Sequence, residues 1–249
     1  MIRAVYFDVD FTLIYPGPTF QGEGYQRFCA KYGIEVDPAA FGRAVASASS
    51  ILDRAQDHFY DPQIFVDYTS HIIKQMGGHG PGVTICAREI YEEWAACQHF
   101  SLYDDVPDVL RTLHAAGLRL GLISNTHRSL AAFQNHFELE GLISAALSSS
   151  EHGYMKPHPS IFEAALRLLD VAPEEAVMVG DSLRQDVDGA RRIGMRGVLV
   201  RRSAGMSNSR SGPVPTLESA RDGVPVIASL TELPPLILSL DKTEVRSEK

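Results

Sequence analysis

The chain is poor in cysteine and has no long apolar run. Its 249 residues include only three cysteines, Cys29, Cys86 and Cys97. They match no disulfide or zinc framework, so we expect free thiols in a reducing cytosol. No apolar run approaches the roughly 18 residues that a membrane-spanning helix needs. Residues 1–3 lead straight into a predicted strand, so we expect no signal peptide.

Positive charge is also scarce. Lys and Arg number 23 against 31 Asp and Glu, for a net charge of −8, which argues against a general nucleic-acid-binding surface. A phosphate substrate is still possible, because the local charge of a binding site, and not the net charge of the chain, decides whether phosphate binds. No G-x-G-x-x-G motif follows a predicted strand, which disfavours a dinucleotide-binding protein. The hydrophobic fraction of 45% is ordinary for a soluble globular chain of one large domain or two small ones.

What the chain does contain is a set of short apolar runs that end in polar residues. Predicted strands at 2–7, 118–123 and 176–179 each end close to an Asp or a Ser. Continuous apolar runs of this length are typical of buried parallel strands, and open α/β sheets place their sites at the carboxyl edge. The segments expected to meet there are 5–13, 121–125, 156–159 and 177–186.

Strands alternate with helices from residue 104 onward. This alternation predicts an α/β fold, a Rossmann-like parallel sheet core with helices on both faces and right-handed crossovers. A loop is expected at 203–223, a last edge strand at 224–228 and a frayed tail at 241–249. The predicted helices are 108–116, 128–136, 159–169 and 186–193, and the further strands are 145–147 and 197–200.

Residues 19–100 show helical spacing without a convincing strand. Apolar residues from Tyr25 to Tyr32 recur at i, i+3, i+4 and i+7, and Pro38 marks the start of a second helix. A further helix is expected at 88–96. We therefore expect two parts, an inserted all-helical cap domain at 16–100 and an α/β catalytic core of 1–15 plus 101–249.

Asp8 and Asp10 are two residues apart at the end of the first strand, so their side chains project from the same side. Two carboxylates placed in this way can divide phosphoryl transfer, one attacking phosphorus and the other handling protons. With Asp181 and Asp186 they put up to four negative charges beside a phosphate, and a pair about 4 Å apart costs roughly 4 kcal/mol at an effective dielectric near 20. A divalent cation is the simplest compensation, and an all-oxygen ligand set favours Mg²⁺.

The four segments together resemble the haloacid dehalogenase superfamily, in its phosphatase branch with a helical cap of the first type. The resemblance implies that Asp8 is the nucleophile, which forms an aspartyl-phosphate, and that Asp10 protonates the leaving oxygen and then activates water. It also implies Mg²⁺ ligands from the carboxylates of Asp8 and Asp181 and from the backbone carbonyl of Asp10. Asp186 is either a ligand through water or an anchor for its neighbours, and it suits the start of the following helix as a cap.

The same resemblance implies that Lys156 contacts both the nucleophile and the phosphoryl group. Ser124 ends a buried strand, where its hydroxyl and the next backbone N–H, that of Asn125, can hold a phosphate oxygen. Thr12 is expected to form a hydrogen bond within the catalytic loop and so to orient Asp10. The sequence therefore predicts a phosphate site shared by Ser124, Asn125 and Lys156.

Two positions depart from the family's usual residues, which weakens any transfer of substrate identity. Phe11 stands where relatives often have Gly, and Gln185 stands where they often have Asn. A ring at position 11 lines the site or packs under the cap. Candidate substrate contacts, each of which is better explained as a surface or core residue, are Tyr15, Phe20, Arg54, His58, Tyr60, His127 and Arg128.

We expect a cytoplasmic, Mg²⁺-dependent phosphatase of small phosphomonoester metabolites, a monomer or homodimer with no nucleic-acid or membrane partner. The retained Asp10 argues against a dehalogenase, because a halide leaving group needs no proton. A phosphomutase is an alternative, although residues 19–100 show no clear basic cluster to hold a bisphosphate. A catalytically idle binding or regulatory relative is a third possibility, against which Asp8, Asp10 and Lys156 are all present.

Overall fold

The computed structural model describes residues 1–52, 58–202 and 223–244, which divide into two compact units. One unit comprises Met1–Tyr15 with residues 102–202 and 223–244, and the other comprises the described part of residues 16–101. Across both units, none of the described helices combines the length and the apolar character needed to cross a membrane.

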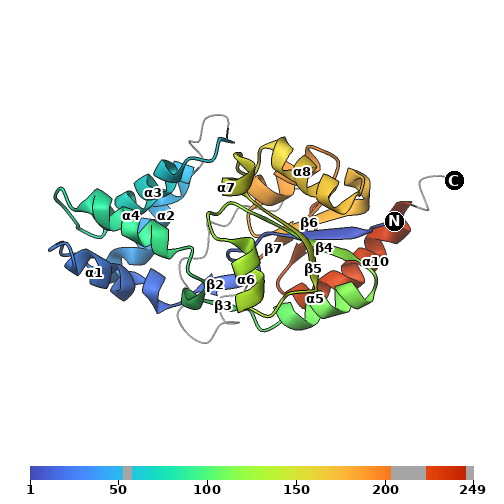
Figure 1. Ribbon diagram of the computed structural model, residues 1–249, viewed down its shortest axis with the longest axis horizontal. Helices are drawn as coiled ribbons and strands as arrows, with labels where there is room; N and C mark the ends of the chain where they lie inside the picture. Colours follow the sequence, from blue (N-terminus) through green and yellow to red (C-terminus); the bar gives the residue numbers. More distant parts are fainter. Residues whose placement is uncertain (53–57, 203–222, 245–249) are drawn as a thin grey trace. The chain divides into compact units, whose positions relative to one another are not determined.

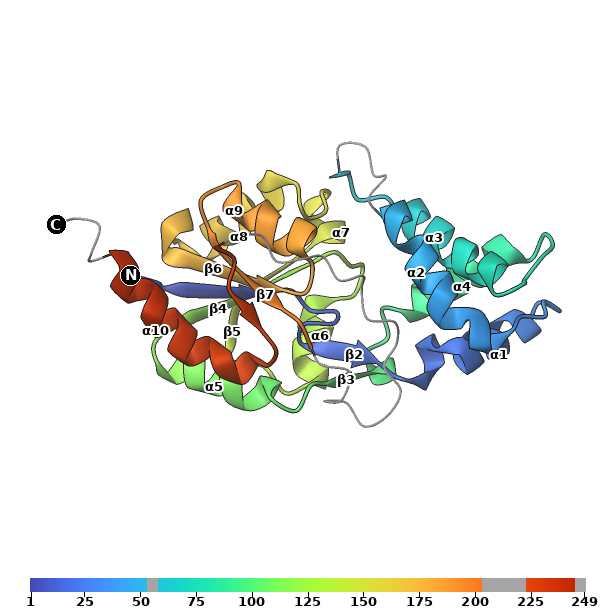
Figure 2. The ribbon, with the colours of Figure 1, turned by 180° about the vertical axis from the view of Figure 1, so that it is seen from behind.

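The first unit is built on a six-stranded sheet (Figures 1 and 2), as the alternation of strands and helices predicts. The strand order is β5-β4-β1-β6-β7-β8, and every neighbouring pair is parallel. The central strands β1 and β6 are buried along their whole length, as their uninterrupted apolar sequences require. The strands are β1 (Ala4–Phe7), β4 (Arg119–Ser124), β5 (Ile143–Ser148), β6 (Ala176–Gly180), β7 (Arg196–Val200) and β8 (Val226–Ile227).

Helices cover both faces of this sheet. Figures 1 and 2 show α8 (Pro159–Leu169) and α9 (Gly189–Arg191) on one face, and α5 (Val106–Ala115) and α10 (Leu233–Glu244) on the other. α6 (Leu130–His136) and the short α7 (Ser149–His152) pack beside β5. The hydroxyl of Tyr6, in β1, donates to the carbonyl of Ala165, in α8, at 2.9 Å. This buried hydrogen bond fixes α8 over the centre of the sheet.

Some element boundaries differ from the predictions. α8 has the predicted limits, with Pro159 at its first position, and β8 lies at the sheet edge, as expected for 224–228. The helix predicted from Asp186 begins earlier, as η6 (Leu183–Asp188), because the Ser182 hydroxyl accepts from the N–H of Gln185 at 3.1 Å. α10 continues to Glu244, so the tail predicted from 241 is wrong up to that residue. The rest of that tail, and the loop predicted at 203–223 apart from Gly223, lie outside the described residues.

The second unit is helical. Its α4 begins at Val83 and not at residue 88, because the buried Val83, Cys86, Ala87 and Ile90 continue one apolar face. β2 (Ile14–Pro16) and β3 (Phe100–Leu102) pair in a small sheet that the sequence did not predict, where the chain passes between the units. The helices are η1 (Pro18–Phe20), α1 (Gly22–Ala30), η2 (Pro38–Ala40), α2 (Phe41–Leu52), α3 (Pro62–Gln75), α4 (Val83–Glu93) and η4 (Cys97–His99).

Candidate active site

The carboxyl ends of β1, β4 and β6 bring the predicted residues to one edge of the sheet. Phe7 in β1 is in register with Leu122 in β4 and with Val179 in β6. Asp8 therefore leaves β1 between its two neighbours, and its N–H donates to the carbonyl of Val179 at 2.9 Å. Ser124 is the last residue of β4 and is buried. The sheet register alone thus places three of the four predicted segments side by side.

Lys156 is buried at the centre of the site and uses all three of its N–H donors. Its Nζ donates to Asp8 Oδ1 at 2.6 Å, to Asp186 Oδ1 at 2.6 Å and to the Ile123 carbonyl at 2.8 Å. Burial alone lowers the pKa of Lys156, but Asp186 and Asp8 outweigh it and raise the pKa above its usual range. The expected contact between Lys156 and Asp8 is therefore present, with the ammonium held charged.

The side chain of Asn125 connects the loop after β4 with the segment that carries Lys156. Its Nδ2 donates to the Lys156 carbonyl at 3.0 Å, and its Oδ1 accepts from the Lys156 N–H at 2.7 Å. The same Nδ2 donates to Oε1 of Gln185 at 3.3 Å, so the residue that departs from the family pattern takes part in the network. Sequence reasoning gave Asn125 a phosphate contact through its backbone and missed this positioning role of its amide.

Asp8, Asp181 and Asp186 form the acidic cluster that could hold a cation. One carboxylate oxygen from each lies within 4.8 Å of the others. Burial, and then Asp8 and Asp186, raise the pKa of Asp181 well above its ordinary value, and burial raises the pKa of Asp186 to about 6. Carboxylates that oppose one another's ionisation in this way fit a divalent cation, since all the donors are hard oxygens.

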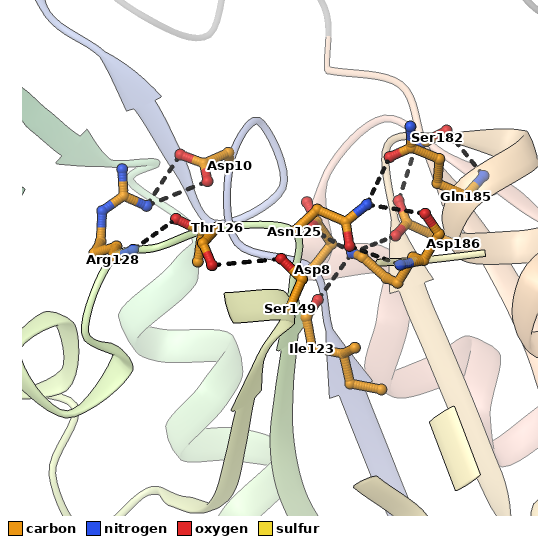
Figure 3. Close-up of polar contacts among 11 residues, drawn as sticks. Asp8, Asp10, Ile123, Asn125, Thr126, Arg128, Ser149, Ser182, Gln185 and Asp186 are labelled. Atoms are coloured by element: carbon orange, nitrogen blue, oxygen red, sulfur yellow. Dashed lines mark hydrogen bonds and ion pairs between the residues drawn. The ribbon is translucent and has the colours of Figure 1, made fainter. Parts of the chain in front are cut away.

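Asp186 also anchors its neighbours. One of its oxygens accepts from Lys156, and the other accepts from the N–H of Ser182 at 3.0 Å. Figure 3 shows these contacts converging on the buried carboxylate. The N-cap of η6 is Ser182, so the Asp186 carboxylate does not cap this helix and contacts Lys156 instead.

Asp10 is held by a different cation. Nη1 of Arg128 donates to both oxygens of Asp10, at 3.1 and 3.2 Å, and in Figure 3 this pair and the contacts of Asp186 lie on either side of Asp8. Burial raises the pKa of Asp10, and Arg128 counteracts that rise. Sequence reasoning considered Arg128 only as a candidate substrate contact. Its position shortly after Ser124-Asn125 was the one signal that it belongs to the site.

The hydrogen bond expected of Thr12 within the catalytic loop is made by its backbone, because its N–H donates to the Val9 carbonyl at 3.3 Å. Oγ1 of Thr12 is buried and has no hydrogen-bond partner among the described residues. The Thr12 carbonyl is held as well, because Nη2 of Arg202 donates to it at 2.6 Å. Nη1 of the same arginine donates to both oxygens of the buried Asp105, at 2.7 Å each. The backbone of the loop is thus held by a residue that follows β7.

The other candidate substrate contacts have structural explanations. Phe11 has a φ of 65°, a conformation that is rare for bulky residues and free for Gly. Within the helical unit, Phe20 packs against Trp94 and Phe100. Arg54 lies outside the described residues. The ring of Tyr15 contacts that of Tyr103, and the hydroxyl of Tyr60 is hydrogen-bonded to the hydroxyl of Tyr91. His58 has a positive φ, and His127 is half-buried.

Comparisons with known proteins agree with this geometry. A family model described as haloacid dehalogenase-like hydrolase matches residues 2–194. The haloacid dehalogenase-like hydrolase domain-containing protein 3 of Homo sapiens is 30% identical, over 98% of this chain and 95% of that protein. The N-acylneuraminate-9-phosphatase of Homo sapiens is also 30% identical, over 96% of this chain and 95% of that protein.

Solved structures share the fold. A predicted phosphoglycolate phosphatase from Haemophilus somnus 129PT aligns with a TM-score of 0.68, over 95% of this chain and 98% of that chain. The sequence identity in this alignment is 16%, so the likeness bears on the fold alone.

Proposed function

This chain belongs to the haloacid dehalogenase-like hydrolase family, and from that membership we propose that it is a Mg²⁺-dependent phosphatase of small phosphomonoester metabolites. The observation that carries the proposal is the contact of Lys156 with both Asp8 and Asp186 beside the acidic cluster. A relative of 30% identity is named as a phosphatase of an N-acylneuraminate phosphate, which supports a small phosphorylated substrate. We further propose that the helical unit is the cap, and that the enzyme is cytoplasmic and a monomer or homodimer.

In the first half-reaction, Asp8 attacks phosphorus in line with the leaving oxygen. The new bond joins a carboxylate oxygen of Asp8 to phosphorus and yields an aspartyl-phosphate. The bond from phosphorus to the substrate oxygen breaks, and Asp10 donates the proton that makes this oxygen an alcohol. Lys156 turns to a phosphoryl oxygen the N–H that it donates to Asp8 in the substrate-free site, and it keeps its contact with Asp186.

In the second half-reaction, the ionised Asp10 takes a proton from water as that water attacks phosphorus. The bond between phosphorus and Asp8 breaks, phosphate leaves, and both carboxylates return to their starting states. The hydroxyl of Ser124 and the N–H of Asn125 complete the phosphate site at the end of β4.

The donor set at this edge suits Mg²⁺. The carboxylates of Asp8 and Asp181 and the backbone carbonyl of Asp10 would hold it, with Asp186 as the anchor of Lys156. Bound there, the ion would neutralise charge on the phosphoryl oxygens. The cluster of Asp8, Asp181 and Asp186 has Lys156 as an ion-pair partner, and a divalent cation would offset the negative charge that remains.

Phosphate release from a panel of phosphorylated metabolites tests the proposal. The panel includes N-acylneuraminate 9-phosphate, other sugar phosphates, nucleoside monophosphates and an aryl phosphate, each with Mg²⁺ or EDTA. We expect turnover that requires Mg²⁺ and a loss of at least about 100-fold in kcat for Asp8→Asn. Absence of release from every compound, or equal release by the Asp8→Asn variant, would contradict the proposal.

A further inference from the structure

Arg128 is among the largest fully buried side chains of the described residues. It is 1% exposed, although arginine is almost never fully buried unless it is paired. Its partner is Asp10, whose side chain is 17% exposed. A buried charge is tolerated when its partner and hydrogen bonds compensate for the lost water, so the pair must be maintained together.

The loop that carries Arg128 is itself held in place. The N–H of Arg128 donates to Oγ1 of Thr126 at 3.0 Å, and the Thr126 carbonyl accepts from Ser149 Oγ at 3.4 Å and from the N–H of Ser150 at 3.3 Å. Figure 3 shows this chain of contacts leading from Ser149 to Asp10. The backbone that carries Arg128 is therefore linked to α7, and its side chain is buried and is not a surface group.

The other cation beside Asp8, Lys156, is not available to Asp10. Lys156 already donates its three N–H groups to Asp8, Asp186 and the Ile123 carbonyl. Each of the two carboxylates, Asp8 and Asp10, thus has its own cation. The arrangement keeps Asp10 from competing with Asp186 for Lys156.

We propose that Arg128 is a positioning residue, which holds the Asp10 carboxylate where it exchanges a proton with the leaving oxygen. This inference rests on the proposed acid–base role of Asp10. A carboxylate has about four lone-pair sites, so the contact with Nη1 leaves sites on both oxygens open for the proton. Arg128 touches Asp10 and acts through it.

The role predicts a selective loss that depends on the leaving group. An alkyl phosphate has a poor leaving group that needs the proton from Asp10, whereas p-nitrophenyl phosphate has a good one that does not. We expect Arg128→Gln to lower kcat for the alkyl ester by about 10- to 100-fold more than for the aryl ester. Both rates come from one preparation, so their ratio is independent of the fraction of enzyme that is folded.

Two further variants complete the experiment. Arg128→Lys keeps the charge but loses the planar fork, and we expect its alkyl-to-aryl ratio to lie between those of the wild type and Arg128→Gln. In an Asp10→Asn background, Arg128→Gln should leave the ratio unchanged, because the group that it positions is already disabled.

Two outcomes would overturn the inference in distinguishable ways. A wild type that turns over neither ester with Mg²⁺ would remove the proposed function and this role together. A wild type that turns over both esters, with an Arg128→Gln variant that loses both rates in equal proportion, would leave the phosphatase intact. Arg128 would then be a structural residue only.

Discussion

The charge state of the site depends on single buried side chains. Lys156 is the partner of two buried carboxylates, so its removal leaves both without their cation. Breaking a buried pair by removing one partner costs about 3–5 kcal/mol, whereas a solvated pair contributes about 0–1 kcal/mol. Burial, more than proximity, decides which ion pairs of this chain matter.

Lys156→Gln should therefore lower the free energy of unfolding by about 3–5 kcal/mol in the absence of Mg²⁺. Lys31→Gln is the matched control, because Lys31 pairs with Glu89 at the surface, with more than half of its own side chain exposed, and should cost at most about 1 kcal/mol. Urea unfolding of both variants measures the difference. Equal losses would show that Lys156 is not a buried ion-pair partner in solution.

At this scale the sequence predicted residue types better than their contacts. The contact of Asp8 with Lys156 is what the family resemblance of their two motifs implies, and the structure confirms that contact. The pairing of Asp10 with Arg128 joins residues 118 positions apart, and no local pattern marks it. Thr12 bonds within the loop through its N–H and not through its hydroxyl, which no motif distinguishes, because a side-chain partner depends on how the loops pack.

At the scale of elements, close contact between strands positions the site. Gly121 in β4 lies opposite Tyr6 in β1, and a Cβ added at Gly121 would lie 2.5 Å from Cδ1 of the Tyr6 ring. That ring cannot move freely, because its hydroxyl is bonded to α8. The absence of a side chain at 121 thus allows β1 and β4 to carry Asp8 and Ser124 side by side.

Gly121→Ala should destabilise the protein by about 1–3 kcal/mol, since it overpacks a full core. Gly42→Ala in α2 is the control, because a Cβ there meets no atom within 4 Å. It should be neutral or should stabilise by up to about 1 kcal/mol, since Ala favours a helix over Gly. Thermal unfolding measures both. A Gly121→Ala variant as stable as the wild type would mean that Tyr6 can relax away from the strand.

Element limits were predictable where the signals are local. α8 begins at Pro159 and has a regular apolar face, so its limits follow from the sequence. The start of η6 depends on Ser182, and β2 and β3 are three residues each, too short for a period-2 pattern to show. The long helical unit carries no motif for a substrate, so its chemistry could not be predicted.

For the molecule as a whole, a net charge of −8 and a buried acidic cluster make stability depend on protons and cations. The pKa of Asp186 is raised by burial to about 6 from 3.8, and that of Asp181 is raised in the same direction. A carboxyl with a higher pKa in the folded than in the unfolded chain binds its proton more tightly when folded. Its contribution to stability is fully present below pH 3.8 and is lost as the pH rises through about 6.

Mg²⁺ should therefore stabilise the substrate-free protein most at neutral pH, where the carboxylates are ionised and repel one another. At one hundred times its Kd the ion would add about 2.7 kcal/mol. We expect the Mg²⁺-induced rise in Tm to shrink as the pH falls through about 6, where protons replace the ion. Thermal scans with Mg²⁺ or EDTA at a series of pH values measure this.

Asp181→Asn is the control, since it removes one carboxylate. It should show a smaller Mg²⁺ response and, in EDTA at neutral pH, a higher Tm than the wild type. An undiminished Mg²⁺ response in that variant, or a response independent of pH, would place the cation elsewhere than on Asp8, Asp181 and Asp186.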